Sequence, residues 1–201
     1  MTEWNTLADV AKDVGVCPLC PLCATRTKAV PGEGNEHPDI MFIGEAPGFH
    51  EDRQARPFVG PAGMFLEQLL TSIGLKRADV FITNVVKCRP PENRDPRPVE
   101  INACAPYLER QAELLNPKVI VTLGRFSMAK YFATESISRV HGIPRKHNGM
   151  IVFPMYHPAA ALHQPTLRHT IEADMLKIPK VLAELSSQDK AKDDPKQLPL
   201  L

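Results

Sequence analysis

The five cysteines of this chain are spaced in a way that suits metal binding. Cys17 and Cys20 form a C-x2-C pair that can bind one metal ion, and Cys88 and Cys104 supply a second pair with a wider spacing. Two such pairs favour ligation over the alternative in which each buried thiol is a small apolar side chain. Zinc and a [4Fe-4S] cluster each accept four thiolates, so these residues leave both open. Because the count is odd, we expect at least one cysteine not to be a ligand.

A second group of residues lies in glycine-rich and proline-rich loops. The small residues of GEAPG at 44–48 let a ligand approach the backbone closely. Phe58, in the loop RPFVGPAG, offers a stacking surface for a planar base or else anchors the loop in the core. Asn84 can pair with a donor and an acceptor on a pyrimidine edge, or can cap a strand. His157 can stabilise negative charge on a leaving group.

Basic residues gather in the loops that we expect at the same end of the molecule. They suit contacts with phosphate groups, although a solvated loop face has the same composition. These residues are Lys87, Arg89, Arg94, Arg97, Arg139, Arg145 and Lys146. Because the formal net charge is only +1, nucleic acid would have to be attracted by local clusters rather than by the whole molecule.

Strands and helices alternate along the predicted secondary structure. Apolar runs bounded by turn residues predict strands at residues 39–44, 80–86, 118–123 and 150–156. Apolar residues at helical spacing predict helices at 6–16, 62–73, 99–115, 124–132 and 166–185, the last interrupted at Pro179. This alternation implies an α/β fold with a parallel sheet covered on both faces. Ligands in such folds bind beyond the carboxyl ends of the strands, where GEAPG, NVVKCRPP and HPAAAL all fall.

The remaining segments and the composition set the domain boundaries and the class of protein. Residues 137–149 predict an irregular loop, and the polar residues 186–201 predict a disordered tail after a single domain of residues 1–185. With 43% hydrophobic and 23% charged residues and no long apolar stretch, the sequence predicts a soluble protein without a membrane span. The N-terminal residues resemble neither a secretory signal nor a transit peptide, so we expect a cytoplasmic protein without a disulfide framework.

Four motifs together resemble the family-4 uracil-DNA glycosylases of bacteria and archaea. They are GEAPG-x2-ED-x3-RPFVG-x-AG, TNVVKCRPPENRDP, the cysteine at 104 and YHPAAAL, in consistent order and spacing over residues 17–185. The resemblance implies a three-layer αβα sandwich with a central four-stranded parallel sheet. It also implies a [4Fe-4S] cluster held by Cys17, Cys20, Cys88 and Cys104, which leaves Cys23 as the non-ligand.

The activity that this resemblance implies is base excision repair. A monofunctional hydrolase of this kind flips uracil out of DNA and hydrolyses the N-glycosidic bond, leaving an abasic site. The expected partner is uracil-containing DNA, single- or double-stranded. We expect a monomer that acts in the cytoplasm, associated with the nucleoid of a prokaryote.

The same resemblance assigns roles to individual residues. It implies a uracil pocket in which Phe58 stacks on the base, Asn84 reads its polar edge and His157 faces O2. The full set of pocket residues is Glu45, Ala46, Glu51, Phe58, Asn84 and His157. His157 is the expected catalytic residue, with Glu45 and Glu51 as the two candidates for a general base. Leu162 is expected to fill the space left by the flipped nucleotide, and Arg89 and Arg94 to contact DNA.

Three positions depart from the family pattern: Ala55, where glycine is usual, His141, where we expect arginine, and Cys23. The sequence CRPPENRDP lacks the basic loop ending in histidine of a related subgroup that captures DNA covalently, so we expect turnover. Two rival functions remain. One is a zinc-stabilised DNA-binding module without catalysis, and the other is a redox protein in which an iron–sulfur cluster is the working part.

Overall fold

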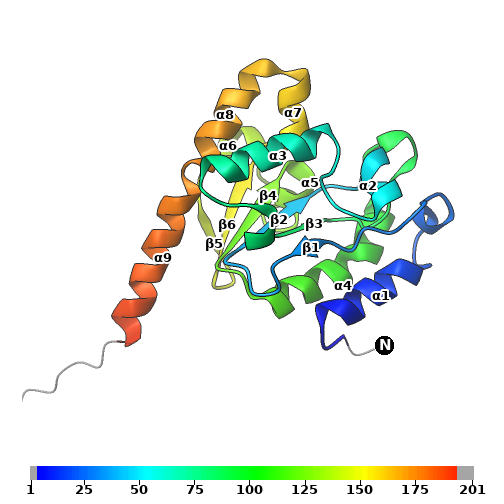
Figure 1. The fold of residues 1–201 in the computed structure, drawn as a ribbon, viewed down its shortest axis with the longest axis horizontal. Coiled ribbons are helices and arrows are strands. Elements are labelled where there is room, and N and C mark those ends of the chain that lie inside the picture. Colours follow the sequence, from blue (N-terminus) through cyan, green and yellow to red (C-terminus); the bar gives the residue numbers. More distant parts are fainter. Residues whose placement is uncertain (1–3, 194–201) are drawn as a thin grey trace, which may run out of the picture.

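A computed structural model of the chain describes residues 4–193. Within them, a single sheet of six strands has the order β1-β3-β2-β4-β6-β5 (Figure 1). The strands are β1 (Glu33–Gly34), β2 (Ile40–Gly44), β3 (Phe81–Asn84), β4 (Val119–Leu123), β5 (Arg145–His147) and β6 (Met150–Met155). The four central strands β3, β2, β4 and β6 run parallel, and they are the four that the sequence predicts. The two edge strands are antiparallel additions, so a sheet of only four strands is not confirmed.

Strand β5 and the short helix α6 (Ile137–Val140) lie in the segment predicted as an irregular loop, so that prediction was wrong in part. The sequence Arg-Lys-His gives β5 no apolar alternation, because an edge strand faces solvent. The turn from β5 into β6 has positive φ angles of 46° at Asn148 and 85° at Gly149. An Asn-Gly pair of this kind is a hairpin signal that identifies β5 better than its own residues do.

Helices cover both faces of the sheet, as the alternation predicts (Figure 1). α1 (Leu7–Val16) and α4 (Pro98–Leu115) pack on one face, and α3 (Pro61–Ser72) and α8 (Pro165–Met175) pack on the other. The described residues also form α2 (Phe49–Gln54), α5 (Arg125–Ala129), α7 (Pro158–His163), α9 (Ile178–Asp193) and the 3-10 turns η1 (Pro21–Ala24), η2 (Arg77–Asp79) and η3 (Pro91–Asn93).

Successive side chains of the strands alternate between two hydrophobic clusters. Ile40 and Phe42 of β2 pack against α3 and α8, whereas Met41 and Ile43 pack against α1 and α4. All five residues of β2 are buried, because a central parallel strand is covered on both faces. The three-layer αβα arrangement is therefore confirmed.

The last predicted helix is two helices in the structure. α8 ends at Met175, and Pro179 is the second residue of α9, where a proline costs no backbone hydrogen bond. α9 projects away from the body (Figure 1) and continues past residue 185 to Asp193, within the segment predicted as a tail. Residues 194–201 of that predicted tail lie outside the described residues.

Across residues 4–193, no helix has the length and apolar character that crossing a membrane requires.

Candidate functional site

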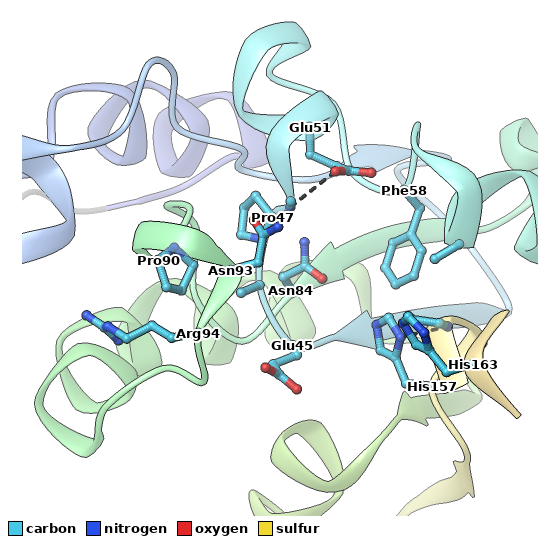
Figure 2. A pocket seen from close by; sticks show the side chains of 14 residues that line it. Glu45, Pro47, Glu51, Phe58, Asn84, Pro90, Asn93, Arg94, His157 and His163 are labelled. Carbon is cyan, nitrogen blue, oxygen red and sulfur yellow. Dashed lines mark hydrogen bonds between the residues drawn. The ribbon is translucent and has the colours of Figure 1, made fainter. Parts of the chain in front are cut away.

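A pocket of about 390 Å³ opens where the parallel strands end at their carboxyl edge. Its walls come from the loops after β2 and β3, from α2, from the loop before α3 and from the start of α7 (Figure 2). All six residues predicted to line a common pocket do so: Glu45, Ala46, Glu51, Phe58, Asn84 and His157. They meet because β2, β3 and β6 run in the same direction and finish at the same edge.

Phe58 lies in the pocket wall with its backbone in an unfavourable conformation that neighbouring residues maintain. Its φ angle is 52°, in the left-handed region, and the residue is only 5% exposed. Arg77 donates hydrogen bonds to the carbonyl oxygens of Phe58, at 2.8 Å, and of Pro57. A Cβ atom at Gly63 would lie 1.9 Å from the Phe58 carbonyl oxygen, so only glycine lets α3 pass this close. The Phe58 ring stacks on that of His157, with 5.5 Å between centroids.

Glu51 fastens the same loop. One carboxylate oxygen, Oε1, accepts hydrogen bonds from the backbone N–H groups of Val59 (2.9 Å) and Gly60 (2.8 Å). The other, Oε2, accepts from the backbone N–H of Gly48 at 3.1 Å. The carboxylate of Glu51 therefore joins the two loops on either side of α2 and is already engaged with three donors.

Asn84 brings an unpaired amide oxygen to the pocket. The residue ends β3 and is 2% exposed, and its Oδ1 is buried with no hydrogen-bond partner. Buried amide oxygens are rarely unpaired, so this atom marks a place for a donor from a ligand. A Cβ atom at Gly44 would lie 2.3 Å from Oδ1 of Asn84 and 2.6 Å from Cζ of Phe58. Glycine at position 44 therefore keeps the space between the amide and the ring open.

His157 presents a neutral imidazole. It is the N-cap of α7, and its Nδ1 accepts a hydrogen bond from the backbone N–H of Ala159 at 3.1 Å. Burial lowers the pKa of His157 to about 4, and the carboxylate of Glu51 opposes this only weakly. In a neutral ring whose Nδ1 is an acceptor, the proton is on Nε2. The geometry thus gives the pocket one uncharged N–H donor.

Glu45 is the available carboxyl group of the pocket. Among the pocket residues drawn in Figure 2, none makes a hydrogen bond to it. Burial raises the pKa of Glu45 to about 7; the negative charge of Asp95 adds to the effect and Arg125 opposes it. A carboxyl group with a pKa near neutrality can take up or release a proton at physiological pH.

The cysteines lie on the other side of the sheet. All five are free thiols; Cys17, Cys20, Cys88 and Cys104 are buried in the hydrophobic cluster beneath α1 and α4, and Cys23 is half-buried. Burial raises the pKa of Cys20 and Cys88, and that of Cys104 to about 11. In the described part of the chain, no three His, Cys, Asp or Glu side chains are arranged to hold a single metal ion.

Arg26 links the two cysteine pairs, which sequence reasoning missed. Its Nη1 donates to Sγ of Cys88 at 3.2 Å and to the carbonyl oxygen of Cys17 at 2.9 Å. A guanidinium group in this position favours the thiolate form of Cys88 and lowers the pKa that burial raises.

Lys87 is not a surface residue, so its prediction as a phosphate contact was wrong. It is 1% exposed, and Nζ donates to Oγ1 of Thr83 (2.6 Å), the carbonyl oxygen of Asn84 (2.8 Å) and Oε1 of Gln111 (2.7 Å). Burial lowers the pKa of Lys87 to about 7. The ammonium group joins the end of β3 to α4.

Four of the other basic residues differ in their distance from the pocket. Arg145 and Lys146 belong to β5 and pair with the amino half of β6, away from the pocket, so their predicted place was also wrong. Arg94 lines the pocket and donates to both carboxylate oxygens of the buried Glu100. Arg89 lies beside the pocket wall.

Leu162 is a large apolar side chain left exposed in α7. It is 49% exposed on the helix that His157 caps. Its predicted insertion into DNA stays a prediction.

Several pocket residues were not named individually as pocket residues, although some lie in motifs predicted at this edge: Pro47, Gly48, Ala62, Pro90, Asn93, Ala159 and His163. His163 lies opposite Pro90 across the pocket (Figure 2). Most of these residues are sequence neighbours of predicted ones, and that adjacency was the available signal. His163 is the last residue of α7. Its place in the pocket wall depends on the direction of this short helix, which the sequence does not predict.

Comparison with known proteins identifies relatives of this chain. The profile described as "Uracil DNA glycosylase superfamily" matches residues 31–179. A type-4 uracil-DNA glycosylase of Sulfurisphaera tokodaii is 51% identical over 184 residues, covering 87% of this chain and 84% of the relative. One of Thermotoga maritima is 44% identical, covering 88% of this chain and 94% of the relative. A type-5 enzyme of Thermus thermophilus is 37% identical, covering 53% and 55%.

The type-4 matches cover more than four fifths of both partners, and the profile match over residues 31–179 includes the strands whose ends build the pocket. This chain therefore belongs to the uracil DNA glycosylase superfamily and, within it, to the type-4 uracil-DNA glycosylases.

Proposed function

We propose that this protein removes uracil from DNA by hydrolysing its N-glycosidic bond. The observation that carries the proposal is the pocket in which an unpaired amide, an aromatic ring and a neutral imidazole converge. Such a set can bind a planar pyrimidine and accept the charge of its departure.

Recognition of the base rests on Asn84 and Phe58. The buried Oδ1 of Asn84 accepts the N3–H of uracil, and the amide nitrogen donates to its O4. The Phe58 ring provides the stacking face. Gly44 admits the base, because any side chain there would fill the gap between the amide and the ring.

The reaction breaks the bond between C1′ of the sugar and N1 of uracil, and the electron pair leaves with the base. Negative charge then gathers on O2, where Nε2–H of His157 donates a hydrogen bond. A neutral donor does not protonate the base, so it stabilises the uracil anion without an uphill proton transfer. Water adds to C1′ and gives its proton to the carboxylate of Glu45.

Glu45 suits the role of general base better than Glu51. The carboxylate oxygens of Glu51 accept hydrogen bonds from three backbone N–H groups. Loss of these hydrogen bonds would loosen the loop that carries Phe58. Glu45 has a pKa of about 7, so a substantial fraction is ionised at neutral pH. Glu51 is accordingly a positioning residue in this proposal.

We further propose that Cys17, Cys20, Cys88 and Cys104 hold a [4Fe-4S] cluster. Four free thiols buried in one apolar cluster fit such a group. Such a cluster would accept one thiolate from each of these four cysteines, which would not have to converge on a single ion as zinc ligands do. When bound, the cluster supplies metal–thiolate bonds that tie the N-terminal segment to the loop after β3 and to α4.

Iron content tests the cluster independently of activity. Cys88→Ser should lose iron, visible absorbance and stability, whereas the matched Cys23→Ser should retain all three. Equal iron content in both variants would contradict this ligand set, and a colourless wild-type protein containing zinc would favour the DNA-binding module.

The function itself is tested by base release from a uracil-containing oligonucleotide, with a thymine-containing oligonucleotide as the control. Asn84→Ala should abolish release, and Asn102→Ala, on the exposed side of α4, should not alter it. Activity in Asn84→Ala that instead follows the oxidation state of the protein would favour the redox alternative.

The remaining proposals concern the setting of the reaction. DNA is the substrate in single- or double-stranded form, and the protein acts as a monomer in the cytoplasm at the nucleoid. Sedimentation of the purified protein tests the monomer, and release from matched single-stranded and duplex oligonucleotides tests the substrate form.

A further inference from the structure

An exposed aromatic ring with two arginines over it lies beside the pocket. Phe49, the first residue of α2, is 43% exposed. The guanidinium carbon of Arg53 is 4.5 Å from the centroid of its ring, and that of Arg89 is 5.2 Å away. We call Phe49, Arg53 and Arg89 the rim cluster. Its members come from two segments that are far apart in sequence, α2 and the loop after β3.

The charges of the rim cluster are not neutralised within the protein. Among the described residues, neither Arg53 nor Arg89 forms an ion pair with a carboxylate. Most other arginines do: Arg56, Arg77, Arg94, Arg110, Arg125, Arg145 and Arg168. Arg89 is oriented by a neutral group, because its Nε donates to Oδ1 of Asn93 at 2.8 Å.

The acidic neighbours of Arg53 face inward. Glu51 accepts from backbone groups of its own loop, and the buried Asp52 accepts from the backbone N–H of Thr27 at 2.9 Å. Neither carboxylate is therefore free to pair with Arg53. The aromatic ring of Phe49 contacts both guanidinium groups, and cation–π contact of this kind orders an arginine without cancelling its charge.

The rim cluster adjoins the pocket on both of its segments. Gly48 precedes Phe49 and lines the pocket, and Pro90 and Asn93, next to Arg89, line it too. Across the pocket from Pro90 lies His163 of α7 (Figure 2). A DNA strand that places one nucleotide in the pocket brings its neighbouring phosphates to the edge of the pocket, and the rim cluster adjoins that edge.

We propose that the rim cluster is a binding site for the DNA backbone, in which the Arg53 and Arg89 guanidinium groups contact the phosphodiester next to the uracil nucleotide. The proposal rests on the proposed function, because it takes the strand in the pocket to be DNA. Planar guanidinium groups suit phosphate oxygens. Phe49 is a positioning residue in this site, since it contributes no charge.

The salt dependence of DNA binding tests this site. Affinity for a labelled oligonucleotide containing uracil is measured by fluorescence anisotropy over a series of salt concentrations, using His157→Asn as the background so that the substrate is not consumed. Arg53→Gln and Arg89→Gln should each weaken binding several-fold and reduce the slope of log K against log salt by about 1. Phe49→Ala should weaken binding while the net charge stays the same.

Lys118→Gln is the matched control. It removes one positive charge from the residue before β4, at the opposite end of the sheet, so it should leave the slope unchanged. Slopes for Arg53→Gln and Arg89→Gln equal to that of Lys118→Gln would overturn the rim site, as would wild-type affinity in Phe49→Ala. Failure of the wild-type protein to release uracil would instead overturn the proposed function, so the two failures are distinguishable.

Discussion

The neutral state of His157 makes the stability of the fold depend on pH in a predictable way. Folding lowers the pKa of His157 from 6.5 to about 4, chiefly because the partly buried ring loses much of its contact with water. Between these two values the unfolded chain binds a proton that the folded protein does not. The free energy of unfolding therefore falls as the pH drops through this window. Above the unfolded pKa, the ring is neutral in both states and His157 costs no stability.

The size of this effect follows from the two pKa values. At about pH 5, the imidazole is mostly protonated in the unfolded chain and mostly neutral in the folded protein, so the loss is about 2 kcal/mol. Below the folded pKa of about 4 the loss reaches its limit, about 3 kcal/mol. The direction is fixed by the sign of the shift.

His157→Asn removes the titration and keeps the helix cap. Asparagine is a strong N-cap residue, so its side chain can still accept from the backbone N–H of Ala159. Urea unfolding of both proteins at about pH 7 and about pH 5 should show a loss on acidification that is about 2 kcal/mol smaller in the variant. Equal losses in the two proteins, or a ring titration observed by NMR near the ordinary histidine pKa, would refute a neutral imidazole in the folded protein.

Three further substitutions probe the groups around the pocket. Gly44→Ala should abolish uracil release, because its Cβ would lie 2.3 Å from Oδ1 of Asn84; rates near wild type would contradict the packing. Glu51→Ala should lower the free energy of unfolding by about 2–4 kcal/mol as well as activity, since three backbone donors lose their acceptor; denaturant unfolding measures this. Lys87→Met should cost a similar amount, about 2–4 kcal/mol, against less than about 1 kcal/mol for the partly exposed Lys130→Met, and equal costs would be inconsistent with a buried hydrogen-bond network around Lys87.

The central sheet is predictable from the sequence because buried parallel strands are continuous apolar runs. Ile40–Gly44 and Val119–Leu123 are such runs, and every residue in them is buried. The edge strands are not predictable in this way. Glu33–Gly34 and Arg145–His147 carry no apolar pattern, since they are defined by pairing with a neighbour rather than by burial of their own side chains.

The candidate site is predictable where chain direction decides the outcome. The strand ends at one edge bring Glu45, Asn84 and His157 to one pocket. The motifs that directly follow the predicted strands identify that edge in the sequence. The positions of charged side chains are less predictable, because burial depends on partners from distant segments. Lys87 belongs to a run of basic loop residues, yet its Nζ is buried and donates a hydrogen bond to Gln111 of α4.

Glu45 and Glu51 show how two like residues of one motif acquire different chemistry. Both follow β2 and line the same pocket, so the sequence alone assigns them equally. The backbone then separates them: α2 turns Glu51 toward three N–H groups, whereas Glu45 precedes the helix and meets no donor among the residues drawn in Figure 2. Burial of a carboxyl group without hydrogen-bond donors favours its protonated form, which is the condition of Glu45. A carboxyl group in this condition can exchange a proton with water in the pocket, and this is why we propose Glu45 as the general base, whereas Glu51 holds the loop.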